Sequence, residues 1–388
     1  MKIEPIVDNT SLAEFCKRQS KASFIAVDTE FVREKTYWPI LCLVQIAGPE
    51  ENAAIDALAP GIDLTPVDAL LTDPNILKVF HAGRQDIEIF FHRDHTVPAP
   101  IFDSQVAAMV CGFGDQVAYD RLVDKLLGVK VEKSSRFADW SRRPLSQKQL
   151  KYALADVIHL RDAYEALAER LEESGRAHWL EEEMAILTDP ATYRLDPELA
   201  WRRIKSRGNN PRFLGILREV AAWREREAQQ RDLPRNRVLR DNALLGVASH
   251  APETPEQLTR SRGIFAGFAK GRMAEGLIEA VKRGAELDSD ELPRPLQGKR
   301  VPNGVGPLTD LLKTLLKHNC EKNHVATRLV ANVDDLQQIA ADDEADVPAL
   351  RGWRRELFGE QALALKHGRL AMTAKGSSIR LIELPDAK

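Results

Sequence analysis

A change in the hydrophobic pattern about halfway along the chain most constrains its fold. Before about residue 190, runs rich in β-forming residues alternate with stretches of helical spacing. The runs that predict strands are 23–31, 40–47, 53–57 and 77–81, and the stretches that predict helices are 84–92, 104–110, 121–127 and 146–173. Strands that alternate with helices are typical of an α/β domain.

Beyond residue 190 the periodicity is helical until a short hairpin is predicted at the end. Two proline-containing segments, 188–197 and 286–307, lack the helical periodicity and are predicted to be linkers. The predicted domains are therefore 1–190, 191–290 and 291–388. Helices are expected at 198–206, 211–231, 241–249, 264–282, 308–318, 324–329, 334–341 and 353–365, and the hairpin at 369–374 and 378–384.

The charge is distributed unevenly among these parts. The whole chain of 388 residues has a net charge of −3, which alone argues against a protein that binds nucleic acid. Residues 1–190 carry −10, whereas residues 191–300 hold 22 Lys and Arg against 15 Asp and Glu, and residues 301–388 are neutral. The basic segment is a weak indication of a polyanionic partner.

Composition excludes several other classes of protein. A 44% hydrophobic and 29% charged chain is typical of a globular fold and not of a disordered one. No apolar run is long enough for a transmembrane helix, and the N-terminus has acids and a proline where a secretory signal needs an apolar core. The four cysteines form no Cys-x-x-Cys pair. We expect a cytoplasmic protein with no membrane partner.

Two acids in an apolar strand are the first candidates for chemistry. Asp28 and Glu30 lie in SFIAVDTEF, and residues two apart share a face of a strand. Burying two unpaired carboxylates is unfavourable, and a divalent cation with oxygen ligands, Mg²⁺ or Mn²⁺, relieves that cost. The alternative is an exposed strand face or a turn.

Three further residues complete the set of candidates. Asp86 lies in the first turn of the helix after strand 77–81, where the helix dipole alone favours an acid. Tyr152 and Asp156 are four residues apart and so share a face of a predicted helix with many apolar residues. A metal ligand, a buried Tyr–Asp hydrogen bond and a solvent-facing acid remain open for Asp156.

Taken together, these motifs resemble a known family. VDTEF, HAGRQDIEIF and YALADV are similar to the three motifs of the DEDD exonucleases, in the subtype with a tyrosine in the third. REKTYWPILCLVQIA and IFDSQVAAMV resemble the ribonuclease D family, and AWRRIK and REVAAWREREAQQRDLPRNRVLRDNALL resemble its helical HRDC module. The resemblance implies a ribonuclease H-like α/β exonuclease domain, with helices flanking a mixed sheet, followed by two all-α HRDC-type domains.

The resemblance also implies an activity: 3′–5′ exoribonuclease action with two divalent ions, Mg²⁺ or Mn²⁺, that releases nucleoside 5′-monophosphates. Asp28 is then the ligand shared by both ions, Glu30 and Asp156 complete one site, and Asp86 holds the second ion. Tyr152 is expected to orient the attacking water, because its ordinary pKa near 10 makes it a poor general base. The implied partners are RNA, especially tRNA precursors and small structured RNAs with 3′ extensions, for an enzyme expected to be a monomer.

Several readings stay open at this stage. Four arginines at helix ends, Arg202, Arg203, Arg235 and Arg237, are candidates for RNA phosphate contacts or for a solvated surface. Asp103 either supports the metal ligands or is a buried helix N-cap, and Tyr37 either stacks on a base or packs in a core. A DNA 3′–5′ exonuclease and a non-catalytic RNA-binding scaffold are the rival functions, since the acids alone do not distinguish RNA from DNA.

Overall fold

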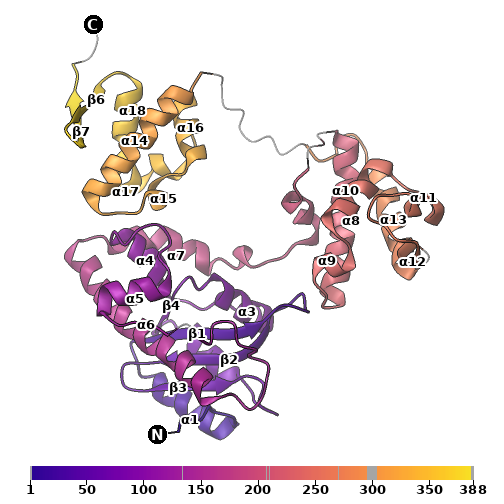
Figure 1. Ribbon diagram of the computed structural model, residues 1–388, viewed down its shortest axis with the longest axis horizontal. Helices are drawn as coiled ribbons and strands as arrows, with labels where there is room; N and C mark the ends of the chain where they lie inside the picture. Colours follow the sequence, from indigo (N-terminus) through magenta and orange to yellow (C-terminus); the bar gives the residue numbers. More distant parts are fainter. Residues whose placement is uncertain are drawn as a thin grey trace. The chain divides into compact units, whose positions relative to one another are not determined.

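The structure, a computed structural model, describes residues 2–132, 134–206, 208, 210–269, 271–294 and 304–385 (Figure 1). The chain forms two compact units. The first comprises Met1–Glu30, Cys42–Thr192 and Lys299–Lys388, and the second comprises Phe31–Leu41 and Tyr193–Gly298. The domain boundaries drawn from the sequence stay predictions, and part of the expected linker 286–307 lies outside the described residues.

A five-stranded sheet organises the first unit. Its order is β3-β2-β1-β4-β5, with β2 and β3 antiparallel and β1, β4 and β5 parallel, so the predicted mixed sheet is confirmed. The four strands expected from the sequence are present, and the short β5 lies at the sheet's edge. The strands are β1 (Phe24–Val32), β2 (Ile40–Ala47), β3 (Asn52–Asp56), β4 (Leu77–Phe80) and β5 (Ile101–Asp103).

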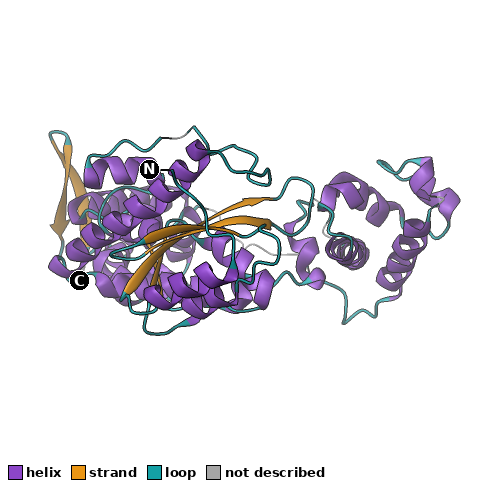
Figure 2. Cartoon of the chain, turned by 90° about the horizontal axis from the view of Figure 1, so that it is seen from below, coloured by secondary structure: helices purple, strands orange, loops and turns teal. Residues whose placement is uncertain are grey.

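Helices lie around this sheet, as Figure 2 shows. The longest, α6, begins with a capping box in which Ser146 and Gln149 satisfy each other's backbone N–H groups. One face of α6 is buried, including Leu150, Val157 and Leu160. The helices of this part are α1 (Asn9–Gln19), α2 (Thr65–Thr72), α3 (Arg84–Asp94), α4 (Ser104–Val110), α5 (Tyr119–Leu127), α6 (Gln147–Glu173) and α7 (Glu181–Thr188).

Among the helices of this part, α1, α2 and α7 were not expected from the sequence. The signal for α1 was nonetheless present, because Asp8 caps its N-terminus and Leu12, Phe15, Cys16 and Gln19 are buried at helical spacing. Within the described part of the chain, no helix is both long and apolar enough to cross a membrane.

Residues after 304 pack into the same core as the sheet's helices. Leu312 and Leu315 of α14 belong to one buried cluster with Met109 and Val110 of α4. The Ala326 backbone N–H donates to the Met109 carbonyl at 2.9 Å. The elements are α14 (Gly306–Asn323), α15 (Thr327–Val330), α16 (Val333–Ala341), α17 (Gly352–Arg354), a π-helical turn (Arg355–Gly359), α18 (Glu360–Lys366), β6 (Leu370–Lys375) and β7 (Ser378–Glu383). Strands β6 and β7 form the predicted terminal hairpin.

The second unit is helical except for Phe31–Leu41, which includes the link between β1 and β2. Its core is built on α8, against which α10 and α13 pack. The predicted helix 264–282 is wrong in one respect, since Gly271 adopts an extended conformation and divides it into α12 and α13. The elements are a 3₁₀ helix (Pro197–Arg203), α8 (Pro211–Gln230), α9 (Arg235–Val238), α10 (Asp241–His250), α11 (Pro255–Thr259), α12 (Ala266–Ala269) and α13 (Arg272–Glu286).

Candidate active site

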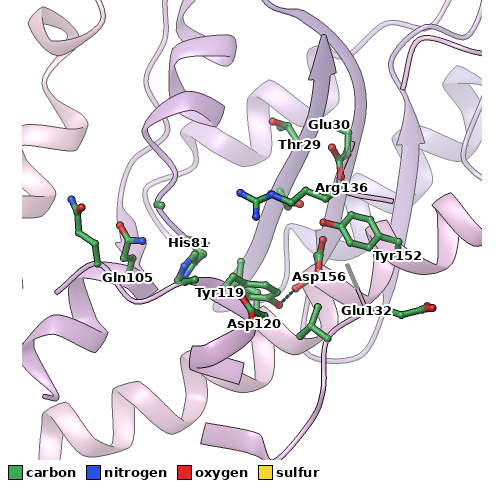
Figure 3. Close-up of a pocket in the computed structure, with 16 residues that line it drawn as sticks. Thr29, Glu30, His81, Gln105, Tyr119, Asp120, Glu132, Arg136, Tyr152 and Asp156 are labelled. Carbon is green, nitrogen blue, oxygen red and sulfur yellow. Dashed lines mark hydrogen bonds between the residues drawn. The ribbon is translucent and has the colours of Figure 1, made fainter. Parts of the chain in front are cut away.

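Strand β1 and helix α6 bring three of the predicted acids together. One carboxylate oxygen from each of Asp28, Glu30 and Asp156 can be chosen so that all lie within 4.8 Å of one another. The three side chains line a cavity of about 480 Å³ together with Tyr152 (Figure 3). Residues 28 and 156 are far apart in sequence, so the cluster depends on the packing of α6 beside the sheet.

The acids are held where their charges are unfavourable. Burial and, to a smaller extent, the charge of Asp156 together raise the pKa of Asp28 to about 7. Burial and then the charge of Asp28 raise the pKa of Glu30 to about 10, and burial raises the pKa of Asp156 to about 7. Without a cation these carboxylates therefore stay protonated at pH values well above those at which aspartate and glutamate usually ionise.

This donor set fits a hard divalent cation. Asp156 is 8% exposed, and its Oδ1 has no hydrogen-bond partner in the described part of the chain. A buried acceptor without a donor is unfavourable, and three clustered carboxylates offer the oxygen ligands that Mg²⁺ and Mn²⁺ prefer. The residues present are therefore suited to hold metal.

Asp86 lies beside this group but is not part of it. Its carboxylate accepts a hydrogen bond from the hydroxyl of Thr29, which the sequence reading did not single out. Burial and then the charge of Asp28 together raise the pKa of Asp86 to about 8, so the two carboxylates interact electrostatically. The position of Thr29 between the two acids of the first motif was the available signal.

Two tyrosines, Tyr152 and Tyr119, interact with Asp156. Burial raises the pKa of Tyr152, and the charges of Asp156 and Glu30 raise it further, so the phenol stays protonated and can donate a hydrogen bond from its O–H group. The hydroxyl of Tyr119, at the start of α5, donates to the backbone carbonyl of Asp156. Sequence reasoning missed Tyr119, because nothing local in the chain connects it with α6.

Asp103 is the N-cap of α4. Its carboxylate accepts from the backbone N–H groups of Gln105 at 2.8 Å and Val106 at 3.3 Å. It also accepts from Ala82 at 3.1 Å and Gly83 at 2.9 Å, in the turn that leads into α3 and Asp86. Of the two readings left open, the structure therefore confirms the buried N-cap, and the same carboxylate anchors the turn before Asp86.

The four arginines proposed for RNA occupy different surroundings. Arg235 pairs with buried Glu225 at 2.6 Å and with the Tyr37 hydroxyl at 2.8 Å. Tyr37 is only 3% exposed, so core packing is confirmed for it. Arg203 is exposed and lines a cavity of about 490 Å³ with Arg235, whereas Arg202 and Arg237 are exposed elsewhere on the second unit. Their contact with RNA stays a prediction.

Comparison with known proteins identifies the family. Residues 3–172 match a family described as 3′–5′ exonuclease, and residues 213–281 match the HRDC domain. The curated ribonuclease D of Gluconacetobacter diazotrophicus is 50% identical over 381 residues, which cover 98% of this chain and 97% of the relative. The ribonuclease D of Nitrobacter hamburgensis is 52% identical over 377 residues, 97% of this chain and 98% of that protein. The chain belongs to the ribonuclease D family.

The fold agrees with this membership. The crystal structure of Escherichia coli RNase D superimposes with a TM-score of 0.80 at 31% identity, covering 94% of this chain and 98% of that one. As a member of the ribonuclease D family, the chain is a 3′–5′ exoribonuclease. The ribonuclease H-like exonuclease domain and an HRDC domain are confirmed, whereas the second HRDC-type domain stays a prediction. Exonucleases of the DEDD family depend on metal, in agreement with the acidic cluster.

Proposed function

We propose that this exoribonuclease hydrolyses RNA from the 3′ end with two divalent cations, Mg²⁺ or Mn²⁺, and releases nucleoside 5′-monophosphates. The observation that carries the proposal is the cluster of Asp28, Glu30 and Asp156 in one cavity with Tyr152. Two such divalent ions, when bound, polarise a water molecule and stabilise the charge on the attacking and leaving oxygens of an in-line displacement.

The chain's own residues would bind the metal ions and position the attacking water. Asp28 would be a ligand of both ions, Glu30 and Asp156 would complete one site, and Asp86 would hold the second ion. The Thr29 hydroxyl orients the Asp86 carboxylate, and Tyr152 donates a hydrogen bond that positions the attacking water. Because the pKa of Tyr152 is raised, the phenol does not remove a proton from that water.

The direction of digestion and the metal ligands can be tested together. RNA labelled at the 5′ or the 3′ end is incubated with Mg²⁺ or Mn²⁺ and with wild type or Asp28→Ala. We expect a 5′-labelled ladder that shortens stepwise and an immediately released 3′ label, both abolished by EDTA and by the substitution. Activity retained in Asp28→Ala contradicts the ligand assignment, and equal digestion of a matched DNA oligonucleotide contradicts a preference for RNA.

We propose that tRNA precursors and other small structured RNAs with 3′ extensions are the substrates. The Escherichia coli relative is described as an exoribonuclease involved in structured RNA processing. The basic segment 191–300 supports binding of an RNA body, because its Arg203, Arg224 and Arg235 line one cavity with Arg33 and only two acids. We further propose that the enzyme works as a monomer in the cytoplasm, where these RNAs mature.

The contact with an RNA body is tested by binding and not by turnover. We expect Arg203→Ala with Arg237→Ala to weaken binding of a tRNA precursor and to reduce the slope of log affinity against log salt by about 1 to 2. Arg231→Ala is the matched control, since that exposed arginine pairs with Glu227 at 2.6 Å. An unchanged affinity rejects the contact. Arg235 is unsuitable for this test because its removal leaves Glu225 buried and unpaired.

A further inference from the structure

The active-site cavity contains one cation that the proposed mechanism does not use. Arg136 lies on the segment between α5 and α6 and lines the same cavity as Asp28, Glu30, Tyr152 and Asp156. Figure 3 shows its side chain extending into the space between Glu30 and His81. Among the described lining residues, Arg136 is the one permanent cation, since burial lowers the pKa of His81 and keeps it neutral.

Arg136 is not committed to a structural ion pair. Within the described residues its guanidinium makes no ion pair with a carboxylate, although several acids line the same cavity. Its guanidinium lies over the ring of Phe137, whose centroid is 5.5 Å from the guanidinium carbon. In contrast, Arg143 on the same segment is bound to Asp56 at 2.5 Å and so has a structural role.

The charge of a site that holds metal and RNA favours such a cation. The charges of the four proposed ligand carboxylates and of two divalent ions cancel. The phosphodiester of a bound RNA then adds one negative charge to a cavity that Asp120 and Glu132 also line. That charge grows in the transition state of hydrolysis, in a cavity where interactions between charges are strong. A guanidinium is suited to this position because its planar fork of N–H groups matches the oxygens of a phosphate.

The neighbouring residue has an unusual exposure. Phe137 is 93% exposed, the highest value among the exposed large hydrophobic residues of the described chain. An aromatic side chain left in water beside a nucleic-acid site is suited to stacking on an unpaired base, which is how single-stranded RNA is commonly held. The cation–π contact with Arg136 keeps the two side chains next to each other.

We propose that Arg136 and Phe137 form a nucleotide subsite, in which Arg136 binds a phosphate oxygen at the RNA 3′ end and Phe137 stacks on a base of the terminal dinucleotide. The inference rests on the proposed two-metal mechanism and adds to it the recognition of the substrate. Arg136 then compensates the negative charge of the phosphodiester that the two ions do not neutralise. Phe137 holds the 3′ end of the strand in place for successive cleavage.

The test compares variants on a short single-stranded RNA in steady-state and single-turnover assays. Arg136→Ala is expected to lower kcat/KM about 10- to 100-fold, and Arg136→Lys to recover part of the loss by restoring the charge without the fork. Phe137→Ala is expected to raise KM about tenfold with kcat within twofold, and Phe137→Trp to restore it. Arg142→Ala is the matched control, because Arg142 is exposed on the same segment but does not line the cavity.

Two further measurements separate the possible failures. The Mg²⁺ concentration for half-maximal activity should stay the same in Arg136→Ala; a shift shows that Arg136 acts through the acids and overturns the subsite. If wild type is active, Asp28→Ala is inactive and Arg136→Ala stays within twofold of wild type, the subsite alone is wrong. An inactive wild type, or an active Asp28→Ala, contradicts the proposed function instead.

Discussion

Replacing Asp28 by asparagine should stabilise the metal-free protein at alkaline pH although it abolishes activity. The pKa of Asp28 is raised to about 7 by burial and by the charge of Asp156, whereas the unfolded chain has the ordinary value of 3.8. The folded state therefore binds more protons than the unfolded state between these two values. Stability contributed by the protonated acid is complete below pH 4 and is lost as the pH rises through 7.

The magnitude follows from the shift. Each pKa unit corresponds to about 1.4 kcal/mol, so a shift of three units sets an upper limit of about 4 kcal/mol. Asp28 is partly accessible to solvent, and the clustered acids share their protons, both of which reduce the effect. We expect Asp28→Asn to raise the free energy of unfolding by about 1–2 kcal/mol at pH 8 in EDTA, and by much less at pH 4.5.

Thermal unfolding in EDTA and in Mg²⁺ at both pH values is the assay. A gain of about 1–2 kcal/mol corresponds to a few degrees in Tm, and Mg²⁺ should stabilise wild type while leaving Asp28→Asn nearly unchanged. Glu132→Gln is the control, because Glu132 is an exposed carboxylate at the edge of the same cavity. If Asp28→Asn lowers Tm equally at both pH values in EDTA, burial of the charge is not what raises the pKa.

Four further substitutions have definite expected outcomes. Tyr152→Phe should lower kcat about 10- to 100-fold without changing the half-saturating Mg²⁺ concentration, and the pH profile of wild type should show no loss of activity from ionisation of the phenol below pH 10. Asp103→Ala should cost about 2–4 kcal/mol in urea unfolding, because four backbone N–H groups lose their acceptor. The side chain of Arg354 is 3% exposed and pairs with Glu182 and, at 2.8 Å, with Glu183. Arg354→Ala should therefore lower the free energy of unfolding by about 3 kcal/mol, whereas Glu182→Gln should lower it by less than about 1 kcal/mol. Limited proteolysis that releases residues after 304 only from Arg354→Ala would support its role, and equal cleavage of both variants would contradict it.

Local pattern was sufficient for many of the elements and for pairs of site residues. Alternation along β1 places Asp28 and Glu30 on one face, and helical spacing in α6 places Tyr152 next to Asp156. The predicted helix 264–282 shows the limit of that reasoning, because Gly271 interrupts a periodicity that continues on both sides. Helix α1 lies within its reach, since buried residues recur at helical spacing after the capping Asp8.

The sequence by itself therefore determined which side chains carry the chemistry and which short element holds each one, because alternation and helical repeat are properties of neighbouring residues. Only the tertiary structure decided that β1 and α6 meet, that Thr29 holds Asp86, and that Arg136 extends into the acidic cavity. It also decided that residues after 304 share a core with the exonuclease helices. These contacts join residues far apart in the chain, and they depend on the order of strands in the sheet and on which apolar faces pack together.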